Sequence, residues 1–243
     1  MPDRFFAGYD GTVSRAVRAF PVAGLLIAFL PALLLLSLCS IQSTAGDTLL
    51  PVLIALALIT LLTGALHEDG LADAADGLGG GRDADHALLI MKDSRIGSYG
   101  AVALILSFGL RVSALSAVLP LVSPTGAGLL VLAAAALSRT AMVWHWSKLP
   151  PARHDGVAAS AGEPQASAVT FALISGVVSS AILLLLSGAS LPATVLAIAA
   201  FAVTVPAFSQ IVDGKIGGHT GDTIGATQQL TEIAVFAALA LAI

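Results

Sequence analysis

The sequence predicts an all-α fold, a polytopic integral membrane bundle of about seven transmembrane helices, and three observations support this class. Hydrophobic residues make up 57% of the 243 positions and charged residues only 11%, and the mean hydropathy is +0.94. Apolar runs of about 20 residues, the length that crosses the hydrocarbon of a bilayer, recur along the chain. The few charges gather between these runs. Because a soluble domain of this size needs far more polar surface, a lipid bilayer is the expected surrounding.

The apolar runs define the order of the expected spans. We place them near residues 20–41, 49–66, 98–121, 126–147, 168–188, 191–211 and 229–243. The connections on one side are short and contain one charge, Asp47. Nine of the eleven Lys and Arg lie on the other side, in the tail 1–19 and the loops 67–97, 148–167 and 212–228. The positive-inside rule therefore places these longer segments in the cytoplasm. No stretch has the composition of a separate soluble module, so we expect one membrane-embedded domain over 1–243.

The composition argues against a nucleic-acid partner and against a disulfide within the chain. The chain has no basic patch with interleaved aromatic residues, which argues against nucleic acid as a partner. Its single cysteine, Cys39, lies in an apolar run and cannot form a disulfide within the chain.

An acidic cluster follows the second expected span. If the helix continues beyond that span, Asp69, Asp73 and Asp76 lie at positions i, i+4 and i+7 and share one face. Like charges on one helix face repel each other, and a divalent cation would turn this repulsion into binding. Carboxylate oxygens suit Mg²⁺ or Mn²⁺, and no thiolate pair or His spacing favours zinc. The alternative is a solvated acidic helix end, which we consider less favoured because no basic residue lies within the cluster.

The same loop continues with groups that suit a phosphate. Gly80 and Gly81 belong to a run of three glycines, whose backbone N–H groups can approach an anion closely. A polar segment follows, with Lys92, Asp93, Ser94 and Arg95 in sequence, and its two cations can donate charge-assisted hydrogen bonds to phosphate oxygens. Each segment alone is weak evidence, since glycine runs are often flexible and basic residues often anchor a span. Together with the acidic cluster they predict a site for a metal-bound diphosphate.

Other polar residues leave alternatives open. The loop before the last span holds His219 and Asp222, which we expect either to face the same site or only to connect two spans. A proton acceptor for the reaction could be Asp222, His219 or Asp93. Arg111 and Arg139 lie within spans, where a buried charge needs a cavity or a partner, either a carboxylate or a substrate phosphate. His145 stands between Trp144 and Trp146, a pattern typical of the interfacial aromatic belt.

These residues resemble the cobalamin synthase family, also called adenosylcobinamide-GDP ribazoletransferase. The resemblance rests on three blocks in the family's order: His67 to Gly77, Met91 to Gly100, and Gly217 to Gln229 with Glu232. With the hydrophobic layout between them it covers nearly the whole chain.

The resemblance implies a Mg²⁺-dependent enzyme of the cell inner membrane whose active site faces the cytoplasm. It would join adenosylcobinamide-GDP to α-ribazole or its 5′-phosphate, giving adenosylcobalamin or its phosphate and releasing GMP. Asp69, Asp73 and Asp76 would bind the metal, with Lys92, Arg95 and Arg139 near the phosphates. A homo-oligomer, or association with other enzymes of the pathway, is possible for such a protein.

Three other classes share part of this pattern. An enzyme similar to the CDP-alcohol phosphotransferases also places an aspartate-rich helix end at the membrane surface. A membrane prenyltransferase also combines aspartates, Mg²⁺ and a diphosphate, but it is expected to have two separate acidic motifs. A cation transporter is the alternative that is not an enzyme; it is expected to hold its carboxylates in broken helices within the membrane.

Overall fold

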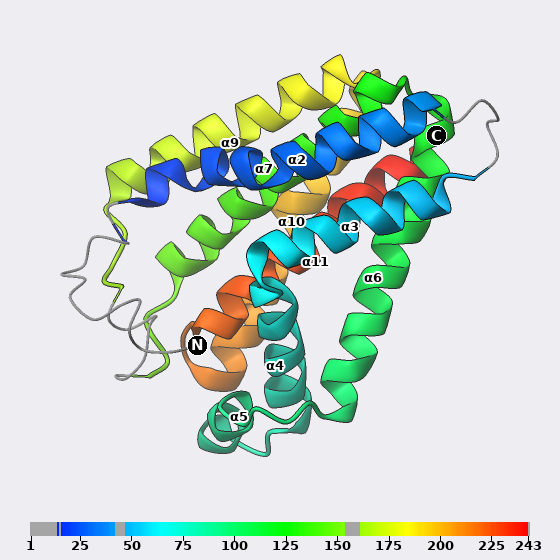
Figure 1. Ribbon diagram of the computed structural model, residues 1–243. Coiled ribbons are helices and arrows are strands. Elements are labelled where there is room, and N and C mark those ends of the chain that lie inside the picture. The colour runs from blue at the N-terminus through cyan, green and yellow to red at the C-terminus, as the bar shows by residue number, and fades with distance from the viewer. Residues whose placement is uncertain (1–13, 15, 42–46, 154–160, 243) are drawn as a thin grey trace.

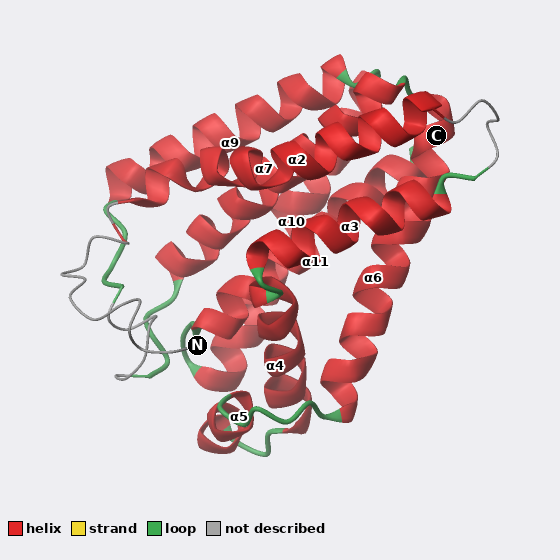
Figure 2. Ribbon diagram, in the orientation of Figure 1, coloured by secondary structure: helices red, strands yellow, loops and turns green. Residues whose placement is uncertain are grey.

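The structure is a computed structural model, and it describes residues 14, 16–41, 47–153 and 161–242. Within these ranges the chain is helical and contains no strand (Figure 2), with one isolated bridge between Pro151 and His219. Most of the tail 1–19 and part of the loop 148–167, including His154, lie outside the described residues. The all-α prediction is therefore confirmed.

The helices follow one another along the chain with short connections. They are η2 (Ala16–Ala19), α2 (Phe20–Ile41), α3 (Leu49–Thr63), α4 (Leu66–Gly80), α5 (Ala84–Met91), α6 (Ser98–Val118), η3 (Leu119–Leu121), α7 (Pro124–Lys148), α9 (Ala166–Leu186), α10 (Leu191–Ile216) and α11 (Gly221–Leu241). Among the described residues, six helical stretches are long and apolar enough to cross a membrane, and the bent pair α3–α4 makes a seventh if it counts as one span. This agrees with the predicted bundle of about seven spans.

Two helices form the centre of the bundle. Helix α7 packs against α2, α9, α10 and α11, and α11 also packs against α4, α6 and α10. Figure 1 shows the end of α2, the start of α3 and the turn η3 between α6 and α7 at one end of the bundle. Helices α4 and α5 and the end of α7 lie at the other end. All predicted site residues except Arg139 belong to elements at this second end, which we call the polar end.

Small residues allow the central helices to approach closely. Gly24 of α2 lies against the backbone of α7 at Ala135, and Gly128 of α7 lies against Ala32 of α2, so that a Cβ atom at either glycine would meet the opposing carbonyl oxygen. Such contacts suit helix packing in lipid, where van der Waals contact replaces the hydrophobic effect as the driving force.

The last span differs from the prediction. Helix α11 begins at Gly221, whereas hydropathy predicted a start near residue 229. A capping box starts the helix, in which Thr220 and Thr223 exchange hydrogen bonds between side chain and backbone. The glycines and hydroxyls of this stretch were interpreted as loop, but their polar groups are buried against neighbouring helices. Helix α10 correspondingly extends to Ile216 and ends at Gly217 in the left-handed conformation.

A sharp break separates the second apolar helix from the acidic one. Helices α3 and α4 meet at 87°, and both connecting residues, Gly64 and Ala65, have positive φ angles of 61° and 57°. Gly64 donates its backbone N–H to Leu61 O, which closes the end of α3. The expected continuous helix is therefore two helices, and the break turns α4 across the polar end.

The break provides a direct stability test. Replacing Gly64 with Ala should lower the free energy of unfolding by about 1 kcal/mol, because an L-residue is strained in the left-handed region. A Cβ atom at this position would meet no other atom within 4 Å, so the effect isolates the backbone conformation. Gly109→Ala in α6 is the matched control, since that glycine also has open space but ordinary helical geometry. Thermal unfolding in detergent should show a loss for Gly64→Ala and none for Gly109→Ala; equal behaviour of the two would contradict this account.

Candidate active site

The acidic face is formed by two helices at the polar end. Helix α4 contributes Asp69 and Asp73, and the first turn of α11 contributes Asp222. The helices touch at Gly70, where a Cβ atom would lie 2.9 Å from the backbone oxygen of Asp222. Asp69, Asp76 and Asp222 each lie within electrostatic reach of Asp73. The structure thus brings together the acidic residues that the sequence placed in separate loops.

Asp76, on the same helix, makes a different set of contacts. Its two carboxylate oxygens accept the backbone N–H groups of Gly97 at 2.6 Å and Gly100 at 2.9 Å. These donors lie at the start of α6, where the first N–H groups of a helix have no partner within the helix. Asp76 is buried, whereas Asp69 is exposed. The contacts therefore give Asp76 a structural role, docking α6 onto α4, and its role as a metal ligand stays a prediction.

The glycine run does not form the expected turn. Gly80 is the last residue of α4, and Gly81, which follows it, donates its backbone N–H to Gly77 O at 2.9 Å. The carbonyl oxygen of Gly81 accepts Lys215 Nζ at 2.6 Å. Because these backbone groups are used within the protein, the anion cradle expected from the glycines is absent from this part of the described chain. The glycines serve close packing instead, since a Cβ at Gly81 would meet Ala87.

The segment between α5 and α6 is exposed at the polar end. Arg95 forms an ion pair with Asp93 at 2.6 Å, and this guanidinium holds the pKa of the Asp93 carboxyl below its usual value. A carboxylate paired in this way is a poor proton acceptor. Lys92 and Ser94 are also exposed. Their phosphate-binding role stays a prediction.

One cation near the acidic face was not identified from the sequence. Arg153 lies in the segment after α7 and its charge acts on both Asp73 and Asp222. Its Nη2 donates to Leu88 O at 2.9 Å, while its buried Nε has no hydrogen-bond partner among the described residues. Loop composition gave no sign of this, because the contact joins Arg153 to Leu88 of α5, which is far from it in the sequence.

The turn between α10 and α11 connects the acidic face with a buried histidine. Thr220 Oγ1 donates to Asp222 Oδ2 at 3.2 Å. His219, the preceding residue, is 3% exposed, and burial lowers its pKa to about 4. The imidazole is therefore neutral at physiological pH and is a weak base. Of the three candidate proton acceptors, Asp222 is the one that lies beside Asp69 and Asp73.

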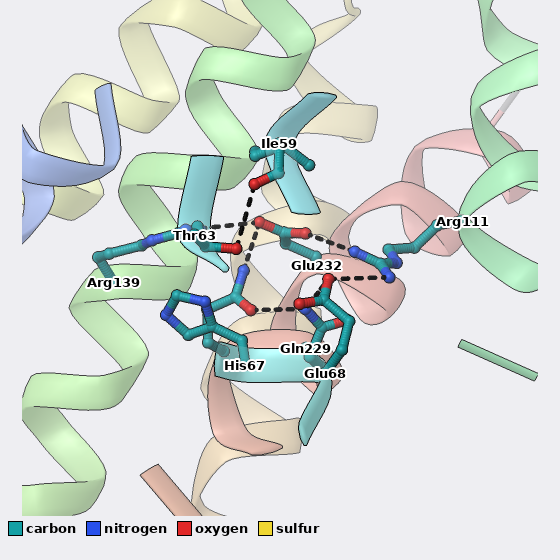
Figure 3. A pocket seen from close by; sticks show the side chains of 9 residues that line it. Ile59, Thr63, His67, Glu68, Arg111, Arg139, Gln229 and Glu232 are labelled. Atoms are coloured by element: carbon teal, nitrogen blue, oxygen red, sulfur yellow. Dashed lines mark hydrogen bonds and ion pairs between the residues drawn. The ribbon is translucent and has the colours of Figure 1, made fainter. Parts of the chain in front are cut away.

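A buried network of charged and polar side chains joins α4, α6, α7 and α11 (Figure 3). Arg111 of α6 pairs with Glu232 of α11 at 3.2 Å and with Glu68 of α4 at 3.7 Å. Gln229 donates to Glu68 at 3.0 Å and accepts from Ser107 at 3.1 Å. The structure thus identifies carboxylates as the partners of Arg111, one of the two alternatives that the sequence left open.

Arg139 belongs to this network rather than to the acidic face. Its Nη1 donates to Glu232 at 3.0 Å, and the residue is 4% exposed. Glu232 also accepts from Gln228, so that one carboxylate holds two arginines and an amide. The predicted contact of Arg139 with substrate phosphate therefore differs from the observed placement, because a carboxylate already neutralises this guanidinium.

The interpretation of His145 as an interfacial belt residue is wrong. The side chain is fully buried between α7, α10 and α11, with its ring nitrogens 2.7 Å from Ser209 Oγ and 3.0 Å from Thr223 Oγ1. Trp146 is buried too and packs on Phe20. The aromatic neighbours in sequence were a misleading signal, because α7 is surrounded by protein along most of its length.

The donor chemistry of the acidic face fits magnesium. No group of three His, Cys, Asp or Glu side chains in the described chain is arranged to hold a metal ion by itself. Magnesium, however, is usually held by one or two carboxylates, with water and substrate phosphates completing its shell. Asp69 and Asp73 match this pattern, since no hydrogen bond from a described residue reaches either carboxylate.

The fold and the site together define a class: a multi-pass membrane protein with an acidic, metal-compatible face at one end of its bundle. The family model described as cobalamin-5-phosphate synthase matches residues 4–240. The adenosylcobinamide-GDP ribazoletransferases of Sinorhizobium medicae (strain WSM419) and Rhizobium meliloti (strain 1021) are 61% and 60% identical over 243 residues, which are 100% of this chain and 92% of each relative. No solved structure matches. The chain belongs to the cobalamin-5-phosphate synthase family, as its motifs predicted, and is an enzyme of that family.

Proposed function

We propose that the protein transfers the phosphocobinamide moiety of adenosylcobinamide-GDP to α-ribazole or its 5′-phosphate, giving adenosylcobalamin or its phosphate and GMP. The names of the relatives support the reaction. The observation that carries the chemistry is the acidic face of Asp69, Asp73 and Asp222, with Arg153 within electrostatic reach.

The reaction is a phosphoryl transfer in which one bond forms and one breaks. The ribose hydroxyl oxygen of the ribazole attacks the phosphorus that carries cobinamide, and the bond from that phosphorus to the GMP oxygen breaks. The hydroxyl proton passes to Asp222, which lies at the start of α11 beside the two carboxylates of α4. Geometry favours Asp222 over Asp93, which is paired with Arg95 on the surface.

Asp69 and Asp73 would hold Mg²⁺ against the diphosphate. When bound, the ion supplies positive charge that neutralises the phosphate oxygens and the departing GMP. Lys92 and Ser94 lie in the exposed segment before α6 and would contact the guanosine side of the diphosphate. Asp76 holds that segment in place through Gly97 and Gly100.

The position in the cell follows from the distribution of charge. The described parts of the basic loops 67–97, 148–167 and 212–228 share the polar end with the acidic face, so we propose that this end faces the cytoplasm, with the chain in the cell inner membrane. A water-soluble nucleotide substrate would then reach the site without crossing the bilayer.

The direct test uses purified protein in detergent with adenosylcobinamide-GDP and α-ribazole. We expect equal amounts of GMP and adenosylcobalamin, loss of both with EDTA, and recovery when Mg²⁺ is added in excess. Comparison of α-ribazole with its 5′-phosphate by kcat/KM identifies the preferred acceptor. Release of pyrophosphate in place of GMP would instead indicate prenyltransferase-like chemistry, and metal flux in proteoliposomes without turnover would indicate a transporter.

A further inference from the structure

A cavity of about 370 Å³ lies at the polar end, beside the turn between α10 and α11. It is formed by the end of α7, the segment that follows it, the residues before α9 and the buried His219. Its lining combines four ring side chains, Trp146, Pro150, Pro151 and Pro164, with polar groups that contribute a similar share of the surface. None of the roles described above uses this cavity.

The histidine in the wall is held rigidly. Its backbone N–H donates to Pro150 O at 2.8 Å, and its backbone oxygen accepts from Ala152 N at 2.9 Å. Gly218 allows this pairing, because a Cβ atom there would collide with the Pro150 carbonyl oxygen. The side chain, in contrast, is incompletely bonded: Nδ1 is buried and has no hydrogen-bond partner within the described residues. Because Nδ1 is shielded from the cavity, Nε2 is the ring nitrogen of His219 that is left to bond a ligand there.

The cavity and the acidic face share a single turn. His219 lines the cavity, and Asp222, three residues later, belongs to the acidic face. Thr220 connects them through its hydrogen bond to the Asp222 carboxylate. A ligand in the cavity would therefore contact the same turn that carries the proposed proton acceptor, although Asp222 itself does not line the cavity.

We infer that this cavity binds the aromatic base of the acceptor nucleoside, with its ribose hydroxyl directed toward Asp222. This rests on the proposed function. The indole of Trp146 and the proline rings suit the faces of an uncharged heterocycle, and neutral His219 offers a hydrogen bond to a ring nitrogen. The lining contains one cation and one anion, Lys148 and Glu163, so its charge does not favour a phosphate over a neutral ring.

The chain offers an internal reporter for this binding. It has only two tryptophans, Trp144 and Trp146, and only Trp146 lines the cavity. In a Trp144→Phe background, titration with α-ribazole alone should change the remaining fluorescence in a saturable way. Adding His219→Ala should raise the Kd at least about tenfold, the effect of one lost hydrogen bond, and His219→Gln should restore part of the affinity. No saturable change, or an unchanged Kd in His219→Ala, overturns the inference.

A second variant fills the cavity without touching the histidine. Ser147→Phe adds a ring to the wall, and we expect it to raise KM for α-ribazole at least about tenfold while KM for adenosylcobinamide-GDP changes little. Ser40→Phe is the matched control, because Ser40 also donates its hydroxyl to a carbonyl of its own helix but lies exposed at the far end of α2.

The two proposals can fail separately. If GMP is released normally but neither His219→Ala nor Ser147→Phe alters KM for α-ribazole, the cavity assignment is wrong and the proposed function stands. If the cavity variants alter α-ribazole binding but the unmodified protein never releases GMP, the cavity stands as a nucleoside site and the proposed reaction is wrong.

Discussion

Asp73→Asn will lower kcat for GMP release by at least about 100-fold, while insertion and expression stay near those of the unmodified protein. The amide keeps the shape of the side chain but removes the negative charge that would bind Mg²⁺, and losses of this order follow the removal of one group that stabilises a transition-state charge. Stability should not fall, because Asp73 is surrounded by Asp69, Asp76 and Asp222 and neutralising it relieves repulsion. The measurements are GMP release at saturating Mg²⁺ and thermal unfolding in the same detergent.

Two further variants separate chemistry from structure. Asp85→Asn removes an exposed carboxylate in the first turn of α5 and should change neither activity nor stability. Asp76→Asn should lower the unfolding temperature even without Mg²⁺, because the carboxylate accepts two backbone N–H groups at the start of α6. Full activity of Asp73→Asn at a defined Mg²⁺ concentration would contradict the assignment of Asp73 as a Mg²⁺ ligand.

The bundle could be predicted from the sequence because lipid imposes a simple rule. A helix that faces hydrocarbon must be apolar over about 20 residues, and α2, α9 and α10 show this plainly. The same rule misplaced the start of α11. Thr223, Thr227 and Gln228 make its first turns polar, yet they are buried against other helices rather than exposed to water. Hydropathy does not distinguish a polar residue in a loop from one in a protein-lined core.

The acidic face was predictable in part for a similar reason. Helical periodicity is local, so the shared face of Asp69 and Asp73 could be derived from their spacing. The break between α3 and α4 at Gly64 and Ala65 could not be predicted from the sequence, since a glycine near the end of an apolar run has many possible roles. Arg153 and the cavity beside His219 depend on contacts between segments far apart in the chain, which no local pattern contains.

Glu232→Gln will destabilise the protein more than any surface substitution, by about 3–5 kcal/mol. Glu232 accepts hydrogen bonds from Arg111, Arg139 and Gln228, all buried, so the variant leaves two guanidinium groups with Glu68 as the remaining carboxylate of the network. A buried charge without a partner destabilises the protein by more than the ion pair stabilises it, because the charge has lost its hydration and has no compensating interaction. On the scale of a 243-residue chain the unfolding temperature should fall on the order of 10 °C.

The charge balance of the network, rather than any single contact, explains this sensitivity. Arg139→Gln combined with Glu232→Gln returns the network to one arginine and one carboxylate, Arg111 and Glu68, which remain 3.7 Å apart. We therefore expect the double variant to be more stable than Glu232→Gln alone, a non-additive result that independent sites do not give. Glu163→Gln, an exposed site before α9, is the control and should leave the unfolding temperature unchanged. If the double variant lost the sum of the two single losses, the buried residues would act separately, and the network would only fill space between α4, α6, α7 and α11.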